Sequence, residues 1–162
     1  MSIRRTLLSF KTLLCPVDFS AHSRLALKYA ESVIRQSQPR GACLTVLYVS
    51  DPLLVAAAGA AYPNRNRMAD QTKAELRRFV NASLSPAAAR SPMVRLTVAE
   101  GDPVQEILSV AARIKADLIV VAAQGRGAIE RWLVGSTTQG VLAHATSPVL
   151  VVPPVRRRQK TR

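Results

Sequence analysis

The chain has 162 residues, of which 48% are hydrophobic and 4% aromatic, and it carries a formal net charge of +13. The length and the aliphatic composition fit a single domain, and the most apolar loop stretch, residues 53–62, is far shorter than the ~20 residues of a membrane-spanning helix. These features exclude a membrane span, and we expect a cytoplasmic protein.

The first half of the chain alternates apolar strands with amphipathic helices. Residues 11–18 predict a buried strand, and Ser20 is placed to cap the helix that follows, in which apolar residues recur every four positions. Residues 42–50 predict a second strand and residues 68–84 a second helix. The loop between them, residues 51–67, is long for a compact domain, which is typical of mobile or functional segments.

The second half continues the same alternation. Residues 93–101 predict a third strand with one face more exposed to solvent than the other. Pro103 is well placed in the first turn of a third helix. Residues 116–123 and 147–153 predict the fourth and fifth strands. A fourth helix lies between them, and three of its residues are expected to face the core: Val141, Leu142 and Ala145.

Apolar strands that alternate with helices are typical of a parallel sheet covered on both faces. We therefore expect an α/β fold: a three-layer α/β/α sandwich with a five-stranded parallel sheet, doubly wound in one of the few strand orders that right-handed crossovers allow. Ligands of such sheets bind beyond the carboxyl ends of the strands, where the strand order reverses. The positions to inspect are Asp18, residues 49–51, Gly101 with Asp102, and the loop after the fourth strand.

The loop after the fourth strand carries a pattern typical of a phosphate site. Residues 120–140, VVAAQGRGAIERWLVGSTTQG, place Gly125 at the strand exit and, nine residues later, Gly135 followed by Ser136 and Thr137. Glycine lets backbone amides approach an anion, and a helix N-terminus favours phosphate. The alternative is an ordinary strand-to-helix connection in which Ser136 only caps a helix, and the spacing alone favours neither.

The order of elements and several motifs resemble the universal stress protein family. The resemblance rests on PVDFS after the first strand, LYV ending the second, GDP before the third helix and GRGAIERWLVGSTTQGVLAHATSPVLVV further on, and it covers residues 11–152. Members that bind ATP carry the pattern GxxGx9G followed by Ser or Thr. Gly125, Gly135 and Ser136 match this pattern, whereas Ala122 stands in the place of the first glycine.

The resemblance implies a Rossmann-like sheet with the strand order 3-2-1-4-5, and it implies which residues hold ATP or AMP. These cofactor-binding residues are Pro16, Val17, Asp18, Val49, Ala122, Gly125, Arg126, Gly135, Ser136 and Thr137. By resemblance, Asp18 contacts the nucleoside, Val49 lies at the adenine through its backbone, and the residues from Gly125 onward hold phosphates. Two alternatives stay open: Asp18 as a turn residue that binds local amides, and Arg126 as a solvated side chain. The methyl group of Ala122 is expected to weaken binding rather than abolish it.

The sequence does not predict efficient catalysis. The lysine of a GxxxxGK[ST] loop is absent, no GxGxxG opens the first helix, and His22 and His144 are isolated in the sequence. Asp18, together with Asp102, is a candidate to hold Mg²⁺ with phosphate oxygens, because magnesium commonly uses one or two carboxylates plus phosphates. Without a base to orient water, we expect hydrolysis to be slow or absent.

Much of the positive charge lies near the two ends of the sequence. Eight basic residues there are Arg4, Arg5, Lys11, Arg156, Arg157, Arg158, Lys160 and Arg162, and subtracting them from +13 leaves +5. We expect a flexible basic N-terminus at 1–10, a universal-stress-type α/β domain at 11–153 and a disordered basic tail at 154–162. A basic tail argues less for a nucleic-acid partner than a basic groove would, so nucleic acid is not the partner we expect.

Three functional hypotheses follow. The leading one is an adenine-nucleotide-binding regulatory module of the stress response that acts on an unidentified partner protein. The second is a nucleotide-independent dimeric stress or scaffold protein. Ala122 supports this alternative because it replaces the first glycine of the ATP-binding pattern. The third is a weak nucleic-acid or membrane-surface binder that uses the basic tail. The resemblance also implies a homodimer through the last strand, and an apolar edge strand tends to pair; its residues are Val149, Leu150, Val151 and Val152.

Overall fold

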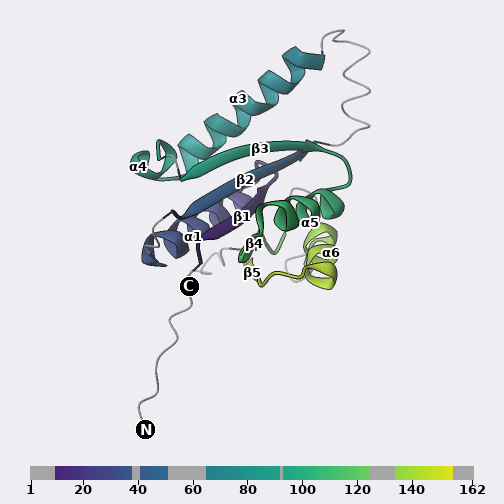
Figure 1. Ribbon diagram of the computed structural model, residues 1–162. Coiled ribbons are helices and arrows are strands. Elements are labelled where there is room, and N and C mark those ends of the chain that lie inside the picture. The colour runs from purple at the N-terminus through teal and green to yellow at the C-terminus, as the bar shows by residue number, and fades with distance from the viewer. Residues whose placement is uncertain (1–9, 38–40, 51–64, 92, 125–133, 155–162) are drawn as a thin grey trace, which may run out of the picture.

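Strands and helices alternate along the chain in the computed structural model, as the apolar periodicity predicts (Figure 1). The structure describes residues 10–37, 41–50, 65–91, 93–124 and 134–154. The elements are β1 (Thr12–Val17), α1 (Ala21–Ser37), β2 (Cys43–Ser50), α3 (Arg65–Ser83), α4 (Pro86–Ala89), β3 (Val94–Glu100), α5 (Pro103–Ile114), β4 (Leu118–Ala122), α6 (Ser136–His144) and β5 (Val149–Val152).

The five strands form one parallel sheet in the order β3-β2-β1-β4-β5, as predicted. The central strand β1 pairs with β2 from Thr12 opposite Cys43 to Val17 opposite Tyr48, and it pairs with β4 on its other side. The strands β3 and β5 form the two edges. The order of the strands therefore reverses between β1 and β4, which is where doubly wound sheets hold their ligands.

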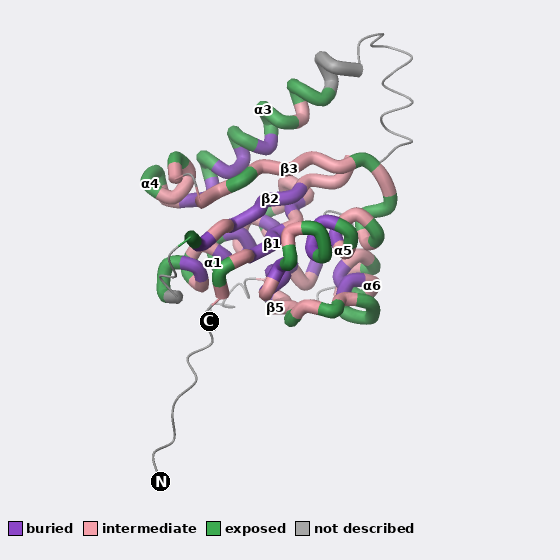
Figure 2. The backbone as a smooth tube through the Cα atoms, viewed as in Figure 1, coloured by how far each residue is buried: buried purple, intermediate pink, exposed green. Residues whose placement is uncertain are grey.

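Alternate residues of each strand enter two hydrophobic clusters, one on each face of the sheet. In β4, Leu118 and Val120 pack with residues of α1 and α3, whereas Ile119 and Val121 pack with residues of α5 and α6. Figure 2 shows these buried stretches along the central strands and the inner sides of the helices. The predicted three-layer sandwich is confirmed.

Capping side chains fix where α1 and α5 begin. The amide of Ser23 donates to Ser20 Oγ over 3.0 Å, which confirms the predicted cap. The amide of Gln105 donates to Asp102 Oδ1 over 2.9 Å, and Pro103 occupies the first turn, where a helix needs no N–H. A cap of this kind stabilises a helix by about 1 kcal/mol.

Gly140 lets α6 approach α5 closely. A Cβ atom at this position would lie 2.6 Å from Val104 Cγ2, nearer than two carbon atoms can pack. Val141 is fully buried in the cluster, whereas Leu142, the next residue of α6, is 47% exposed. The expectation that Leu142 faces the core is therefore wrong, whereas Ala145 does pack against the cluster from the end of α6.

The ends of two predicted segments differ from the structure. The helix α3 begins at Arg65, so residues 65–67 are helical rather than part of the expected loop, and residues 51–64 lie outside the described residues. The short helix α4 follows α3, between the second predicted helix and the third predicted strand, where no helix was predicted. The basic segments at 1–9 and 155–162 also lie outside the described residues. Within the described part, no helix is long and apolar enough to cross a membrane.

Candidate functional site

A cleft of about 410 Å³ lies at the carboxyl ends of β1, β2 and β4, next to the first turns of α5 and α6. Its volume falls within the ~300–1,000 Å³ of small-molecule sites. The lining residues are Pro16, Val17, Asp18, Ser23, Leu47, Val49, Pro103, Ile107, Val121, Ala122, Gln124, Gly135, Ser136, Thr137 and Thr138. Residues more than a hundred positions apart in the sequence thus meet at the switch point of the sheet.

Most of the candidate residues chosen from the sequence line this one cleft. They are Pro16, Val17, Asp18, Val49, Ala122, Gly135, Ser136 and Thr137. Two others, Gly125 and Arg126, lie outside the described residues. Asp102, the second carboxylate considered for magnesium, does not line the cleft, because its side chain caps α5.

Asp18 combines a local structural bond with a place in the cleft. Its Oδ1 atom accepts a hydrogen bond from the Ser20 amide (3.0 Å), and its own amide donates to Ser23 Oγ (3.3 Å). One carboxylate oxygen of Asp18 therefore binds a local amide, as the alternative of a turn residue predicts. This bond does not rule out contact with a ligand, because the half-buried residue also lines the cleft.

Phe19 holds the turn that follows Asp18. Its φ of 64° is left-handed, a conformation that costs a residue with a Cβ roughly 1–2 kcal/mol. The Phe19 ring stacks on Tyr48 with 4.5 Å between ring centroids and meets Phe79 edge to face at 5.5 Å. Arg24 lies 5.2 Å from the centroid of Phe79. Aromatic pairs contribute about 0.5–1.5 kcal/mol each, enough to offset the backbone strain and to fix the turn.

The first turn of α6 presents unused polar groups to the cleft. Gly135 is the N-cap residue and provides no capping side chain. The hydroxyl groups of Ser136 and Thr137 make no hydrogen bond to any described residue, although both residues line the cleft. The N-terminus of a helix carries roughly half a unit of positive charge and several amides without helical partners. This arrangement suits an anion such as phosphate.

Two hydrogen bonds fasten this first turn to the end of β4. The Gly135 amide donates to the Ala123 carbonyl oxygen, and Thr138 Oγ1 donates to that of Ala122, both over 2.8 Å. The half-buried Ala122 lines the cleft, which keeps its volume of about 410 Å³ with the methyl group present. The departure from the glycine pattern narrows the cleft without filling it.

Gln124 is a lining residue to which the sequence assigned no role. It is 6% exposed and follows the end of β4. A buried amide that borders a cleft can both donate and accept hydrogen bonds. Its position directly before Gly125 in the glycine pattern was the available signal.

The described residues contain no constellation typical of catalysis or of a resident metal ion. No group of three or more His, Cys, Asp or Glu side chains in that part of the chain could hold a metal. His144 lies at the end of α6, and its Nδ1 lies 2.9 Å from the Gly140 carbonyl oxygen. Burial raises the pKa of the Cys15 thiol, which keeps it in the unreactive protonated form.

The fold and the cleft define a doubly wound α/β protein with a ligand-sized site at its switch point. The sequence model of the universal stress protein family matches residues 9–153, so the chain belongs to the universal stress protein family.

Individual relatives agree with this assignment over most of their length. A universal stress protein of Thermus aquaticus is 31% identical over 144 residues, which cover 88% of this chain and 98% of the relative. The solved structure of universal stress protein UspA from Lactobacillus plantarum is 27% identical with a TM-score of 0.67, over 90% of this chain and 99% of that one. A universal stress protein solved in complex with cAMP has a TM-score of 0.64 at 24% identity, over 90% and 98% of the two chains.

Proposed function

We propose that this protein is a cytoplasmic adenine-nucleotide-binding module that binds ATP or AMP in the cleft and regulates a partner protein in the stress response. One observation carries the proposal: the uncapped first turn of α6 borders the same cleft as Asp18 and Val49. An anion site and an apolar wall in one cavity match the two halves of a nucleotide. The solved relative in complex with cAMP supports a nucleotide as the ligand class.

The lining suggests how the nucleotide would lie. The phosphates would contact Gly135, Ser136 and Thr137, where amides and hydroxyls are available. Asp18 would accept a hydrogen bond from the ribose, and the backbone of Val49 would meet the adenine beside Pro16 and Val17. We include Gly125 and Arg126 among the phosphate contacts on the strength of the family pattern alone.

Magnesium would accompany the nucleotide rather than occupy a site of its own. Asp18 is the single carboxylate among the described residues that line the cleft, so most ligands of the ion would be phosphate oxygens and water. No described histidine borders the cleft, and we expect hydrolysis to be slow or absent.

Calorimetric titration of the purified protein with magnesium-ATP, AMP and adenosine tests this function. We expect heat of binding and a raised melting temperature with both nucleotides. Adenosine should bind more weakly because it lacks the phosphates. Inorganic triphosphate serves as the control for charge alone. If millimolar nucleotide gives no heat of binding and no shift in melting temperature, the proposal is wrong. That result would favour the nucleotide-independent scaffold protein.

We further propose that the protein forms a homodimer through β5. This strand is a sheet edge, and its residues Val149, Leu150 and Val151 are apolar and half-buried. Val151→Lys should yield monomers in size-exclusion chromatography, because a buried lysine opposes edge pairing. Val98→Lys places the same charge on the other edge strand and should leave the dimer intact. Equal elution of the wild type and Val151→Lys, with folding verified by circular dichroism, would contradict this interface.

A further inference from the structure

A second groove, of about 390 Å³, lies between α3 and the edge strand β3. It shares no lining residue with the nucleotide cleft. Figure 1 shows α3 beside β3 at the edge of the sheet. Three cations line the groove, Lys73 and Arg77 from α3 and Arg95 from β3, over a floor that includes Val80, Val94 and Leu96.

The three cations are exposed and unpaired. Lys73 and Arg77 are one helical turn apart, so they lie on the same side of α3. Among the described residues the single ion pair is between Arg35 and Glu31, which leaves all three cations of the groove without an acidic partner. The groove therefore concentrates positive charge that the fold itself does not neutralise.

The backbone of β3 offers hydrogen-bonding groups at the same edge. The Met93 carbonyl oxygen accepts from the Leu44 amide (2.7 Å), and the Gly101 amide donates to the Ser50 carbonyl oxygen (3.2 Å), so these peptide groups point toward β2. Peptide groups alternate in direction along a strand. Those of Leu96 therefore point away from β2, toward the free edge.

The cations lie on both sides of this edge. Val94 and Leu96 pack against the cluster on the α3 face of the sheet. Because successive side chains of a strand point to opposite faces, Arg95 lies on the other face. A strand added along β3 would thus have Lys73 and Arg77 near one set of its side chains and Arg95 near the other set.

We propose that this groove binds an extended acidic peptide segment of a partner protein, which adds to the sheet as a strand beside β3. Donors and acceptors at strand spacing match a peptide backbone, and the three cations select acidic side chains. A second copy of β3 would bring a second set of the same cations to this edge, so repulsion between like charges opposes self-pairing. A nucleic acid would neutralise the cations but would leave the strand's alternating donors and acceptors unmatched.

Fluorescence anisotropy with the full chain tests the proposal. The probe is a short labelled peptide in which pairs of glutamates alternate with pairs of threonines. We expect it to bind, a version with lysine in place of glutamate not to bind, and a version with backbone N-methyl groups at alternate residues to bind at least tenfold more weakly. Arg77→Glu with Arg95→Glu should also weaken binding at least tenfold.

Matched controls separate this groove from general charge attraction. Lys28→Glu with Arg113→Glu makes the same change at two exposed positions outside the groove and should leave affinity nearly unchanged. If circular dichroism shows that the Arg77→Glu with Arg95→Glu variant does not fold, the Arg77→Gln with Arg95→Gln variant takes its place. We expect this variant to lose less peptide affinity. Equal losses in groove and control variants, or full binding of the N-methylated peptide, would overturn the proposal. So would a single-stranded DNA oligonucleotide that competes for these cations more tightly than the acidic peptide binds.

Discussion

At the amino end of the sheet polar side chains bond to the protein's own backbone, whereas at the carboxyl end several of them face a cleft. The Asp117 carboxylate accepts hydrogen bonds from the amides of Lys11 (3.0 Å) and Thr12 (3.1 Å) at the start of β1. Ser147 Oγ donates to the Ala116 carbonyl oxygen over 2.7 Å. These bonds tie the starts of neighbouring strands together and leave little polar capacity for a ligand.

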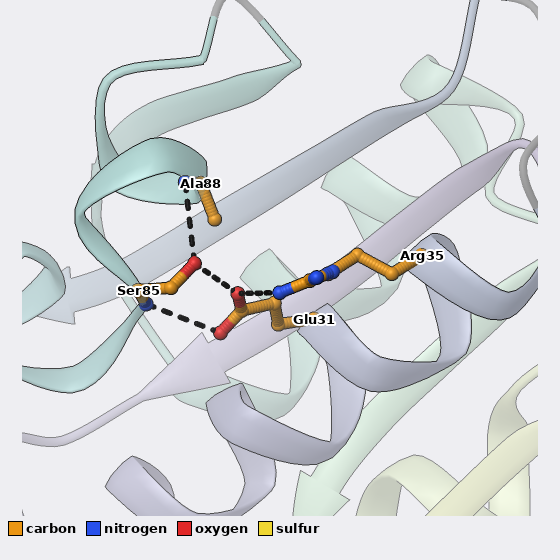
Figure 3. Close-up of polar contacts among 4 residues, drawn as sticks. All are labelled: Glu31, Arg35, Ser85 and Ala88. Carbon is orange, nitrogen blue, oxygen red and sulfur yellow. Dashed lines mark hydrogen bonds and ion pairs between the residues drawn. The ribbon is translucent and has the colours of Figure 1, made fainter.

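A carboxylate network also joins α1 to the segment between α3 and α4 (Figure 3). Glu31 accepts hydrogen bonds from Ser85 through both oxygens, Oε2 from the amide (3.3 Å) and Oε1 from the hydroxyl (2.5 Å). Ser85 Oγ in turn accepts from the Ala88 amide (3.3 Å) and caps α4. Arg35 Nη1 lies 3.5 Å from Glu31 Oε1 but is largely exposed, so it adds little.

The first turn of α6 is arranged differently. It has no capping side chain, and the hydroxyl groups of Ser136 and Thr137 find no partner among the described residues. The polar groups at the amino end thus bond within the protein, whereas the two hydroxyls at the carboxyl end are available to a ligand in the cleft. Substitutions at the two ends should therefore separate stability from nucleotide affinity.

The largest effect should come from a negative charge in the cleft. Thr137→Glu places a carboxylate where we propose phosphates, and like charges at close range cost several kcal/mol. We expect magnesium-ATP to bind about 100-fold more weakly, equivalent to about 2.7 kcal/mol, in calorimetric titration. Ala143→Glu adds the same charge at an exposed position of α6 and is the control. Equal affinities of the two variants would contradict the phosphate site.

A smaller effect, on stability alone, is expected at the amino end. Glu31→Ala leaves the amide and hydroxyl of Ser85 without their acceptor, which should lower the free energy of unfolding by about 1–3 kcal/mol. Urea unfolding measures this loss, with Glu75→Ala, at an exposed position of α3, as the control. Nucleotide affinity should stay the same. A large loss of nucleotide affinity without a loss of stability in Glu31→Ala would contradict the separation of stability at the amino end from nucleotide binding at the carboxyl end.

The smallest effect should come from removing the methyl group of Ala122. Ala122→Gly widens the cleft, and a relieved contact of about 1 kcal/mol would tighten nucleotide binding roughly fivefold. Ala123→Gly introduces the same backbone freedom at a position that does not line the cleft, so its affinity should not change. Unchanged affinity in Ala122→Gly would mean that the methyl group does not limit binding.

The sequence pattern was sufficient to predict the layers and most of the cleft, and the family resemblance added the strand order. Continuous apolar strands predicted a sheet covered on both faces, and the switch point then located Asp18, Val49 and the α6 start. What it could not predict depends on contacts between distant elements. The exposure of Leu142 and the close approach of Gly140 to Val104 both depend on how α6 packs against α5, which no local periodicity encodes.

Two features beside the cleft were missed for the same reason. The left-handed turn at Phe19 depends on stacking with Tyr48 and Phe79 from two other elements. The Glu31–Ser85 network joins residues 54 positions apart, and neither residue is unusual in its local sequence. Positions whose conformation depends on a partner from another element are the ones that sequence patterns leave out.

A crystal structure of the protein soaked with magnesium-ATP would show whether a nucleotide binds in the cleft. We expect a triphosphate against the first turn of α6, the ribose near Asp18 and the adenine beside Val49. A cleft that stays filled by the protein's own side chains, or a nucleotide bound elsewhere, would contradict this expectation.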